Sequence, residues 1–437
     1  MGIYWGVMGI ISYFCSKLFV TKTNMNTRLL LCLLSALLTL ASTAQRRMSV
    51  SGIVVDETTG RVVAGACISG GDQTVVTNAD GFFLLKSVEH ELTAITVSHV
   101  GYRSQRISVD GIATATPSQA GEPLMRIRLQ PATIQLSEVL VVGSDPRSLV
   151  TSAIRKIPDN YSRQPELFSC FYRETAMKRQ RYIMVAEGVV DMYKTSYNSD
   201  TRRDRVAIRK GRRLLSPRSA DTLSVKVTGG PIVPVQLDIV KNVDFLLNEE
   251  ELECYELKME TPTYIADRRQ YVVSIEPRRI MPYALYHGRL YIDQETLAFT
   301  RAELSLDMSD RTKATEMMLV RKPAGVRFRP RELSLLIDYR LEDGVTRISY
   351  VRSLFRFNCD WRRRLFATSF TACCEMAVTS RHAAGDVQPI RGRESFDQRD
   401  AFFDQVEYFR DPDFWQDYNI IEPTESLDRA IDRLLRR

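Results

Sequence analysis

The strongest constraint on the fold of this chain lies between Ser51 and Asp110, where short apolar runs alternate with turn residues. At its centre a β-branched run meets Asn78-Ala79-Asp80-Gly81, and a second apolar run begins at Phe82. This arrangement is typical of a β-hairpin. Further short runs follow at spacings of about 8–12 residues, including one that we expect over Arg61–Ile68. Together they predict a small antiparallel β-sandwich over residues 49–130.

The residues of this sandwich resemble the carboxypeptidase-regulatory-like domain, a transthyretin-like fold common in envelope proteins of Bacteroidetes. The resemblance is carried by Gly52, Val54, Asp56, Thr59, Gly60, Ala64, Gly65, Ala66, Thr77, Asp80, Gly81, Phe82 and the segment Ser98–Tyr102. The sequence departs from the family at Val63, where proline is usual, and in an insertion from Thr114 to Glu122. Despite the family's name, the resemblance implies an accessory domain without catalytic activity.

The N-terminal residues have the parts of a secretory signal. After Met25 come Asn26, Thr27 and Arg28, then the apolar run Leu29–Leu40, then small residues up to Ala44. A basic start, a short apolar core and small residues at the cut are typical of such signals. We therefore expect translation to start at Met25, cleavage after Ala44, and export to the periplasm or the outer membrane. A two-segment membrane anchor over residues 1–44 is the alternative.

Beyond Ala44, the composition argues against two classes of protein. No apolar run approaches the ~20 residues that a membrane-spanning helix needs. Cleavage would remove three basic residues and no acidic one, so the formal charge of +7 would fall to +4. Such a small excess over so long a chain does not indicate a nucleic-acid partner.

Downstream of the sandwich the sequence predicts a linker and a second domain. Residues 131–145 predict a linker or edge strand; Leu136–Gly143 also resembles the segment before the plug of TonB-dependent receptors, but too few residues remain for a full receptor. Residues 146–422 predict an antiparallel β-rich domain. Residues 423–437 predict an amphipathic helix, since their apolar residues recur at helical spacing.

Within the second domain, a helix is expected over Pro146–Ile157, with Asp145 as its cap and Pro158 as its end. Val235–Leu247 is expected to be a helix or an irregular crossover. About ten to twelve strands fill the rest, one of them over Thr315–Val320. The hairpin around Tyr286–Asp293 and the long strands after it resemble the half-open barrel of periplasmic lipoprotein-carrier proteins. The predicted fold class is mainly β: a transthyretin- or Ig-like sandwich, then an antiparallel half-barrel-like domain with a few helices.

Six cysteines remain after residue 44, which is too few for a disulfide scaffold in a chain of this length. A hairpin that turns near Trp361 would place Cys373 opposite Tyr350 and Cys359 opposite Arg364, so these two cysteines should not pair. We expect buried free thiols. A vicinal Cys373–Cys374 bridge is the alternative.

The sequence contains no recognisable catalytic or metal-binding motif. It has four histidines, His90, His99, His287 and His382, without metal spacing, and no C-x-x-C, HExxH, Walker A or GxSxG. We therefore predict no catalytic, cofactor-binding or metal-binding residues and no enzymatic activity. Acidic pairs such as Asp191 with Glu187 are expected on a solvated face, and the Asx residues of the sandwich are expected to form turns rather than to bind calcium.

The densest charge cluster predicts a surface for an anionic partner. It consists of Arg202, Arg203, Arg205, Arg209, Lys210, Arg212 and Arg213. A second run is Arg362-Arg363-Arg364. Lipopolysaccharide phosphates, acidic glycans or a protein face are suitable partners for guanidinium groups. A solvated edge strand that resists aggregation is the alternative.

These patterns predict a non-enzymatic binding or scaffold protein of the cell envelope. Its half-barrel would hold a hydrophobic or amphiphilic ligand or a partner segment. Its partner would be an envelope protein, a lipid or a glycan, with at most peripheral membrane association. A small outer-membrane β-barrel, a protein of the TonB system and an uncharacterised hydrolase are the alternatives.

Overall fold

The computed structural model describes residues 48–71, 73–87, 92–109, 125–132, 145–216, 218, 225–361, 366–397, 399–409, 418 and 420–435. The described residues from Met48 onward belong to one compact unit. The predicted signal region, the linker strand at 136–143 and the run Arg362–Arg364 lie outside the described residues. Among the described helices, none is long and apolar enough to cross a membrane.

The first seven strands form a two-layered sandwich. They are β1 (Met48–Asp56), β2 (Cys67–Gly70), β3 (Gln73–Val76), β4 (Phe82–Ser87), β5 (Ala94–Ser98), β6 (Gln105–Ser108) and β7 (Met125–Leu129). One sheet has the order β4-β1-β7 and the other β3-β2-β5-β6. Alternate residues such as Val50, Val54, Ile68 and Val97 are buried between the sheets. The predicted sandwich is therefore confirmed.

Three details of the predicted sandwich are wrong. The turn around Asn78–Gly81 does not close a hairpin, because β3 pairs with β2 and β4 pairs with β1, in different sheets. The pairing of β1 with β7 is parallel, so the sandwich is not purely antiparallel. The second strand begins at Cys67 and not at Arg61. Local alternation predicts a strand and its turn, but it contains no information about which neighbour the strand pairs with.

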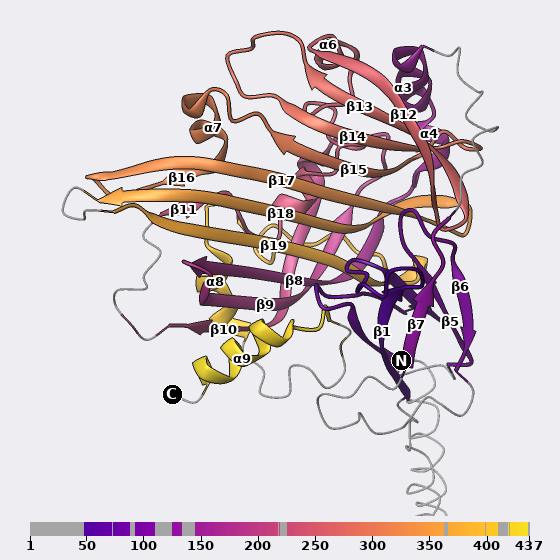
Figure 1. Cartoon of the computed structure of the whole chain (residues 1–437), viewed down its shortest axis with the longest axis horizontal. Coiled ribbons are helices and arrows are strands. Elements are labelled where there is room, and N and C mark those ends of the chain that lie inside the picture. The colour runs from indigo at the N-terminus through magenta and orange to yellow at the C-terminus, as the bar shows by residue number, and fades with distance from the viewer. Residues whose placement is uncertain are drawn as a thin grey trace, which may run out of the picture. The chain divides into compact units, whose positions relative to one another are not determined.

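The remaining long strands form one ten-stranded antiparallel sheet (Figure 1), in the order β10-β9-β8-β19-β18-β17-β15-β14-β13-β12. Their bounds are β8 (Glu166–Lys178), β9 (Arg181–Lys194), β10 (Arg205–Leu215), β12 (Tyr255–Ile265), β13 (Arg268–Pro277), β14 (Tyr286–Asp293), β15 (Phe299–Leu306), β17 (Val326–Glu342), β18 (Val345–Trp361) and β19 (Thr368–Arg381). The predicted fold class is confirmed: the chain is mainly β, a sandwich followed by a large open antiparallel sheet.

The helices and the two short strands lie around this sheet. They are α3 (Pro146–Arg155), α4 (Ile157–Asn160), η2 (Thr201–Arg203), β11 (Lys226–Val227), α5 (Val233–Gln236), α6 (Glu249–Leu252), α7 (Arg311–Met318), β16 (Leu319–Arg321), η4 (Ala384–Asp386), α8 (Phe402–Gln405), η5 (Val406–Phe409) and α9 (Glu425–Leu435). Asp145 caps α3 by accepting from the Ser148 amide, as predicted. Pro158 lies inside the short helix α4, which follows α3 after one residue.

Two further predictions need correction. Of the strand predicted over Thr315–Val320, residues 315–318 instead end helix α7, because Asp310 caps the helix and only Ala314 and Met318 face the core, while residues 319–320 lie in strand β16. In the β18–β19 hairpin, Cys373 lies opposite Leu354 and Cys359 opposite Thr368, a register four residues from the predicted one. The conclusion drawn from that register still holds, since all six described cysteines are free thiols.

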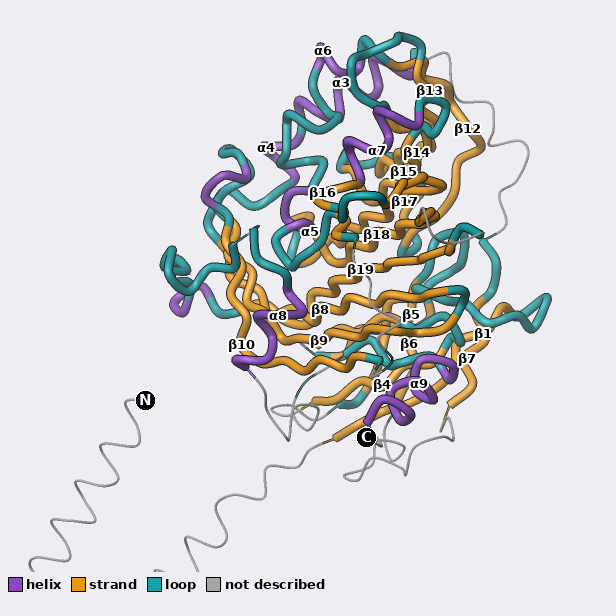
Figure 2. Tube along the Cα trace, turned by 90° about the vertical axis from the view of Figure 1, so that its left-hand side faces the viewer, coloured by secondary structure: helices purple, strands orange, loops and turns teal. Residues whose placement is uncertain are grey.

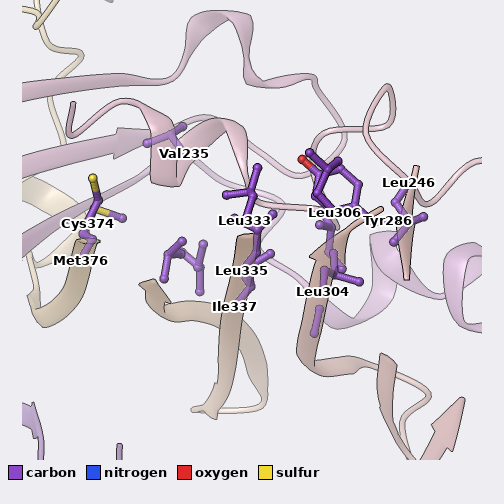
Figure 3. Packing of buried hydrophobic residues seen from close by; sticks show 14 of the residues in the cluster. Val235, Leu246, Tyr286, Leu304, Leu306, Leu333, Leu335, Ile337, Cys374 and Met376 are labelled. Carbon is purple, nitrogen blue, oxygen red and sulfur yellow. The ribbon is translucent and has the colours of Figure 1, made fainter. Parts of the chain in front are cut away.

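One face of the sheet, which we call the inner face, is covered by the chain itself. Residues 228–254, the crossover segment, run over this face between β11 and β12. Figure 3 shows two of its side chains, Val235 and Leu246, close to inner-face residues of the sheet. The labelled sheet residues are Tyr286, Leu304, Leu306, Leu333, Leu335, Ile337, Cys374 and Met376. Most of the inner face is therefore packed core.

The opposite face of the sheet carries the sandwich and residues 420–435, which we call the C-terminal strap. Its Ile420 and Ile421 share an apolar cluster with Val76 of the sandwich and Phe171 of the sheet. The Asn78 amide donates to the carbonyl oxygen of Pro423 at 2.9 Å. Helix α9 lies within the predicted range 423–437 and packs against Val185 of β9.

Candidate functional site

The crossover segment leaves one pocket open on the inner face, with a volume of about 320 Å³. We call it the inner-face pocket. Its walls come from β8, β9, β19, the β11–β16 pair and the loop that leads into α8. Most of its lining is apolar, and the apolar side chains are Ala176, Met184, Val225, Val227, Ala372, Phe402 and Phe403. The rim also carries Lys226, Arg321, Asp400 and Asp404.

The polar group at the base of this pocket is the carboxyl of Glu174. Its Oε1 accepts from the Tyr172 hydroxyl at 2.7 Å and from the Gly230 amide at 2.6 Å. Alternation along β8 would place residues 172 and 174 on the same face, and here both face the crossover segment. Tyr172 also packs edge-on against Phe402, with ring centroids 4.9 Å apart. The carboxyl is therefore held in one position.

Two glycines, Gly229 and Gly230, allow the loop after β11 to approach the carboxyl of Glu174 closely. Gly230 has a φ of +99°, and a Cβ at this position would lie 2.7 Å from the Phe396 ring. A Cβ at Gly229 would lie 3.2 Å from Oε1 of Glu174. The Gly-Gly pair therefore brings a backbone amide against the carboxyl without closing the pocket.

Burial favours the protonated forms of Glu174, Cys374 and the neighbouring Tyr172. Burial raises the pKa of Glu174 above its usual value, against the lowering effect of the bonds from Tyr172 and Gly230. Burial also places the pKa of the Cys374 thiol and of the Tyr172 hydroxyl well above their usual values. A nucleophilic cysteine needs its thiolate form. The Cys374 thiol is therefore not suited to act as a nucleophile.

The raised pKa of Glu174 predicts a pH dependence of stability. The folded chain binds this proton more tightly than the unfolded chain does, so stability falls as the pH rises from the unfolded pKa towards the folded one. We expect Glu174→Gln to remove this loss. Denaturant unfolding should show the variant and the natural chain alike at pH 4, with the variant gaining stability relative to it towards pH 8. A constant difference between the two chains across this range would contradict the assignment.

A second pocket, of about 230 Å³, lies between the sandwich and the sheet. His99 lines it together with Arg301 and Asp338. Burial, helped by the charge of Arg301, lowers the pKa of His99 to about 4. Arg301 pairs with Glu303 at 3.1 Å and with Asp338 at 3.3 Å. A neutral histidine facing ion-paired groups at a packed interface indicates a structural role.

One serine, one histidine and one aspartate do come together on the sheet. Oγ of Ser169 lies 3.0 Å from Nε2 of His382, and Oδ1 of Asp191 lies 3.9 Å from the same nitrogen. In a catalytic triad the carboxylate holds the other ring nitrogen, which orients the base towards the serine. Here the carboxylate and the serine share one nitrogen, and Arg209 engages the carboxylate at 2.7 Å. The arrangement lacks the geometry of a hydrolase site.

Within the described residues, no group of three or more His, Cys, Asp or Glu side chains could hold a metal ion. The Asx residues of the sandwich have structural partners. Asp56 accepts from the Thr59 amide at 2.6 Å and from the Tyr102 hydroxyl at 2.7 Å. Asn78 accepts from the amides of Asp80 and Phe82, and Asp80 accepts from the Glu425 amide of the C-terminal strap.

The predicted anionic-partner cluster lies on η2 and β10, and most of its charges have partners inside the chain. Arg209 pairs with Asp191, Arg212 with Glu187, and Arg213 with Glu407. Lys210 lies over the Tyr418 ring. Arg202 pairs with Asp200, and Arg205 donates to the carbonyl oxygens of Arg202 and Asp204. Arg203, on η2, is exposed. Recognition of an anionic partner by this cluster stays a prediction.

The acidic partners of this cluster are less solvated than expected. Glu187 is fully buried and also receives Arg173 at 2.7 Å. Arg173, itself buried, donates onward to the carbonyl oxygen of Ile421 at 2.6 Å. This buried ion pair therefore connects β8 and β9 to the C-terminal strap.

Sequence reasoning also missed a buried charge network under the crossover segment. Nζ of Lys194 lies 2.7 Å from Asp238 and 3.6 Å from Asp204, and Lys241 lies 2.7 Å from Asp204. Asp238 further accepts from the hydroxyls of Tyr197 and Tyr339, both at 2.8 Å. All four charged side chains are buried. The network fixes the crossover segment to β9 and β17.

Comparison with known proteins identifies the first domain. Residues 50–141 match the family model of the CarboxypepD_reg-like domain, so the N-terminal sandwich is a domain of that family. The match covers less than half of the chain and leaves the large sheet without a family. A search of curated proteins finds no match.

Three of the similar solved structures come from named bacteria. A DUF1329 family protein from Desulfovibrio piger is 12% identical, with a TM-score of 0.22 and coverage of 54% of this chain and 94% of that one. A LolA superfamily protein from Nitrosomonas europaea is 10% identical, with a TM-score of 0.21 and coverage of 57% and 98%. A domain from Vibrio parahaemolyticus, described as an outer membrane lipoprotein-sorting protein domain, is 8% identical, with a TM-score of 0.25 and coverage of 56% and 95%. Scores this low carry no argument about function.

Proposed function

We propose that this chain is a non-enzymatic binding protein of the cell envelope, whose inner-face pocket holds the apolar part of a small hydrophobic or amphiphilic ligand. The observation that carries the proposal is the pocket itself: about 320 Å³ of mostly apolar space left open on a face that is otherwise filled. Ligand pockets range from about 300 to 1,000 Å³, so this pocket is at the small end.

The size of the pocket limits the ligand to a short chain. A long acyl chain would need the length of the inner face, which Val235, Leu246 and other core residues already occupy. A medium-length tail fits the remaining space, and each buried methylene would contribute about 0.8 kcal/mol. An acidic head group would lie near Arg321, which is exposed at the rim.

The predicted export signal supports the proposed location in the cell envelope. The division of the chain into a signal region at 1–44, a sandwich at 49–130, a linker at 131–145, a β-rich domain at 146–422 and a terminal helix at 423–437 is part of the same proposal. The candidate partners are a lipid, a glycan or another envelope protein.

Native mass spectrometry tests the pocket directly. Protein purified from envelope fractions should carry a bound small amphiphile, and titration with decanoate should reproduce a one-to-one complex. Ala401→Trp should abolish both, because Ala401 lines the pocket and is only partly buried, so a larger side chain can enter the space. Ala383→Trp is the matched control, since Ala383 is exposed and lines neither pocket. An unliganded mass together with no decanoate complex would contradict the proposal.

A further inference from the structure

One end of the large sheet carries exposed cations and exposed apolar side chains together. We call it the strand-end surface. It comprises Arg179, Val320, Arg321, Lys322, Arg327 and Phe366. The ends of β8, β17 and β18 lie on the left of Figure 1, and Figure 2 looks onto this side.

The register of the sheet places these residues near the same ends of neighbouring strands. Val326, at the start of β17, lies opposite Trp361 at the end of β18. Thr368, at the start of β19, lies opposite Cys359, and the amide of Arg179 donates to the carbonyl oxygen of Ser369 at 3.1 Å. From β17 to β9 there are four strand spacings of ~4.8 Å, so the surface extends roughly 20 Å across the strands.

The cations of this surface are not neutralised from within. Arg179, Arg321, Lys322 and Arg327 are exposed, and none forms an ion pair with a described acidic residue. The acidic residue nearest in register, Asp360, is engaged by Arg329. Other acidic groups near this end are Glu316 on α7, which is exposed, and Asp400 and Asp404, which share the pocket rim with Arg321. Asp404 lies 3.8 Å from Arg213, so Glu316 and Asp400 remain against the four cations. The strand-end surface therefore has a net positive charge. The arginines of β10, in contrast, mostly pair with acidic residues of the chain.

The strand-end surface also exposes large apolar side chains. Phe366 is 77% exposed and Val320 is 58% exposed, so neither contributes the stabilisation that a buried apolar side chain would. Aromatic and aliphatic side chains beside arginine and lysine suit the boundary of a bilayer, where the apolar groups enter the acyl region and the cations meet lipid phosphates.

We propose that the strand-end surface docks on a membrane surface that contains anionic lipid. The proposal is independent of the ligand pocket, but it has a consequence for it. Arg321 belongs to both the strand-end surface and the pocket rim, so docking would place the mouth of the pocket beside the bilayer. An amphiphile could then move between lipid and pocket without crossing open water.

The sandwich supplies a matched control surface. Arg103, Arg106, Arg126 and Arg128 are equally exposed there. On the described part of the sandwich, Val62 is the one large apolar side chain among the exposed ones. This surface therefore has the same number of cations without comparable apolar anchors.

Flotation with vesicles tests the proposal, using the chain from Met48 onward, which is a compact unit of its own. The vesicles contain phosphatidylethanolamine with or without 30% phosphatidylglycerol. We expect binding only to the anionic vesicles. Reversing the four cations to glutamate in R179E/R321E/K322E/R327E should reduce the bound fraction at least tenfold, and Phe366→Ser alone should reduce it severalfold. Thermal unfolding of each variant establishes that it is folded.

The control variant R103E/R106E/R126E/R128E should keep most of the binding. Equal loss in this control would show that net charge alone drives the association, and unchanged binding in the strand-end variants would show that another surface docks; either result overturns the proposal. A strand-end variant that loses binding to duplex DNA but keeps binding to vesicles would also overturn it. Bound decanoate has no part in the assay, so its outcome is separate from that of the pocket.

Discussion

Replacing Asp238 by asparagine should lower the free energy of unfolding by about 3–5 kcal/mol, the usual cost of removing one partner from a buried ion pair. Asp238 compensates Lys194 at 2.7 Å, and both side chains are inaccessible to solvent. Asparagine keeps the shape, but its single oxygen can accept from Tyr197 or from Tyr339 and not from both, because the two hydroxyls donate to different carboxylate oxygens. The substitution therefore tests the charge and one hydrogen bond, and not the packing. Denaturant unfolding monitored by circular dichroism measures the change.

Two controls separate this effect from a general sensitivity to lost charge. Glu249→Gln removes an exposed partner of Arg155, and its effect should stay below about 1 kcal/mol. The double variant Lys194→Met/Asp238→Leu should lose less stability than Asp238→Asn, because neither charge is then left buried alone. If Asp238→Asn cost no more than Glu249→Gln, the network would not be what fixes the crossover segment.

Gly288→Ala should destabilise the sheet by roughly 2–5 kcal/mol, the combined cost of a strained backbone and an overpacked contact. Gly288 has a φ of +150°, and a Cβ there would overlap with the carbonyl oxygen of Glu303 on β15. The obstacle is backbone, which cannot rotate away as a side chain can. We expect the β14–β15 pairing to open locally, measured as faster amide exchange at Leu304 and as a lower midpoint of unfolding.

Gly392→Ala is the matched control for this substitution. Gly392 has no atom within 4 Å of the added Cβ and no positive φ, so the same change should be nearly neutral. Equal midpoints for the two variants would mean that the backbone at Gly288 relaxes at little cost.

The sequence predicted most of the strands because their alternation is local. The strand β14, for example, lies where the hairpin around Tyr286–Asp293 was predicted. Asp145 and Pro146 likewise predict the start of α3 through short-range chemistry. The turn at Asn78–Gly81 was predicted as a turn, but its path between two sheets depends on partners that no local pattern contains.

The interior of the large sheet was not predictable in the same way. Lys194 and Asp238 are 44 residues apart and have the composition of surface residues. Only the fold brings them together, where each makes the other's burial tolerable. The inner-face pocket has the same origin, since Glu174, Gly230 and Phe402 come from three distant parts of the chain.

The C-terminal strap has a consequence for the order of events during folding. Asn78 and Asp80 bond to residues 345 positions further along the chain. Contacts between such distant residues form late, because closing a long loop costs entropy before any contact offsets it. The contacts of the sandwich with the strap can therefore be completed only after residues 420–425 have been synthesised. Until then, Val76, Phe171 and Tyr350 lack their contacts with Ile420 and Ile421. The chain then exposes an apolar surface that a chaperone could bind.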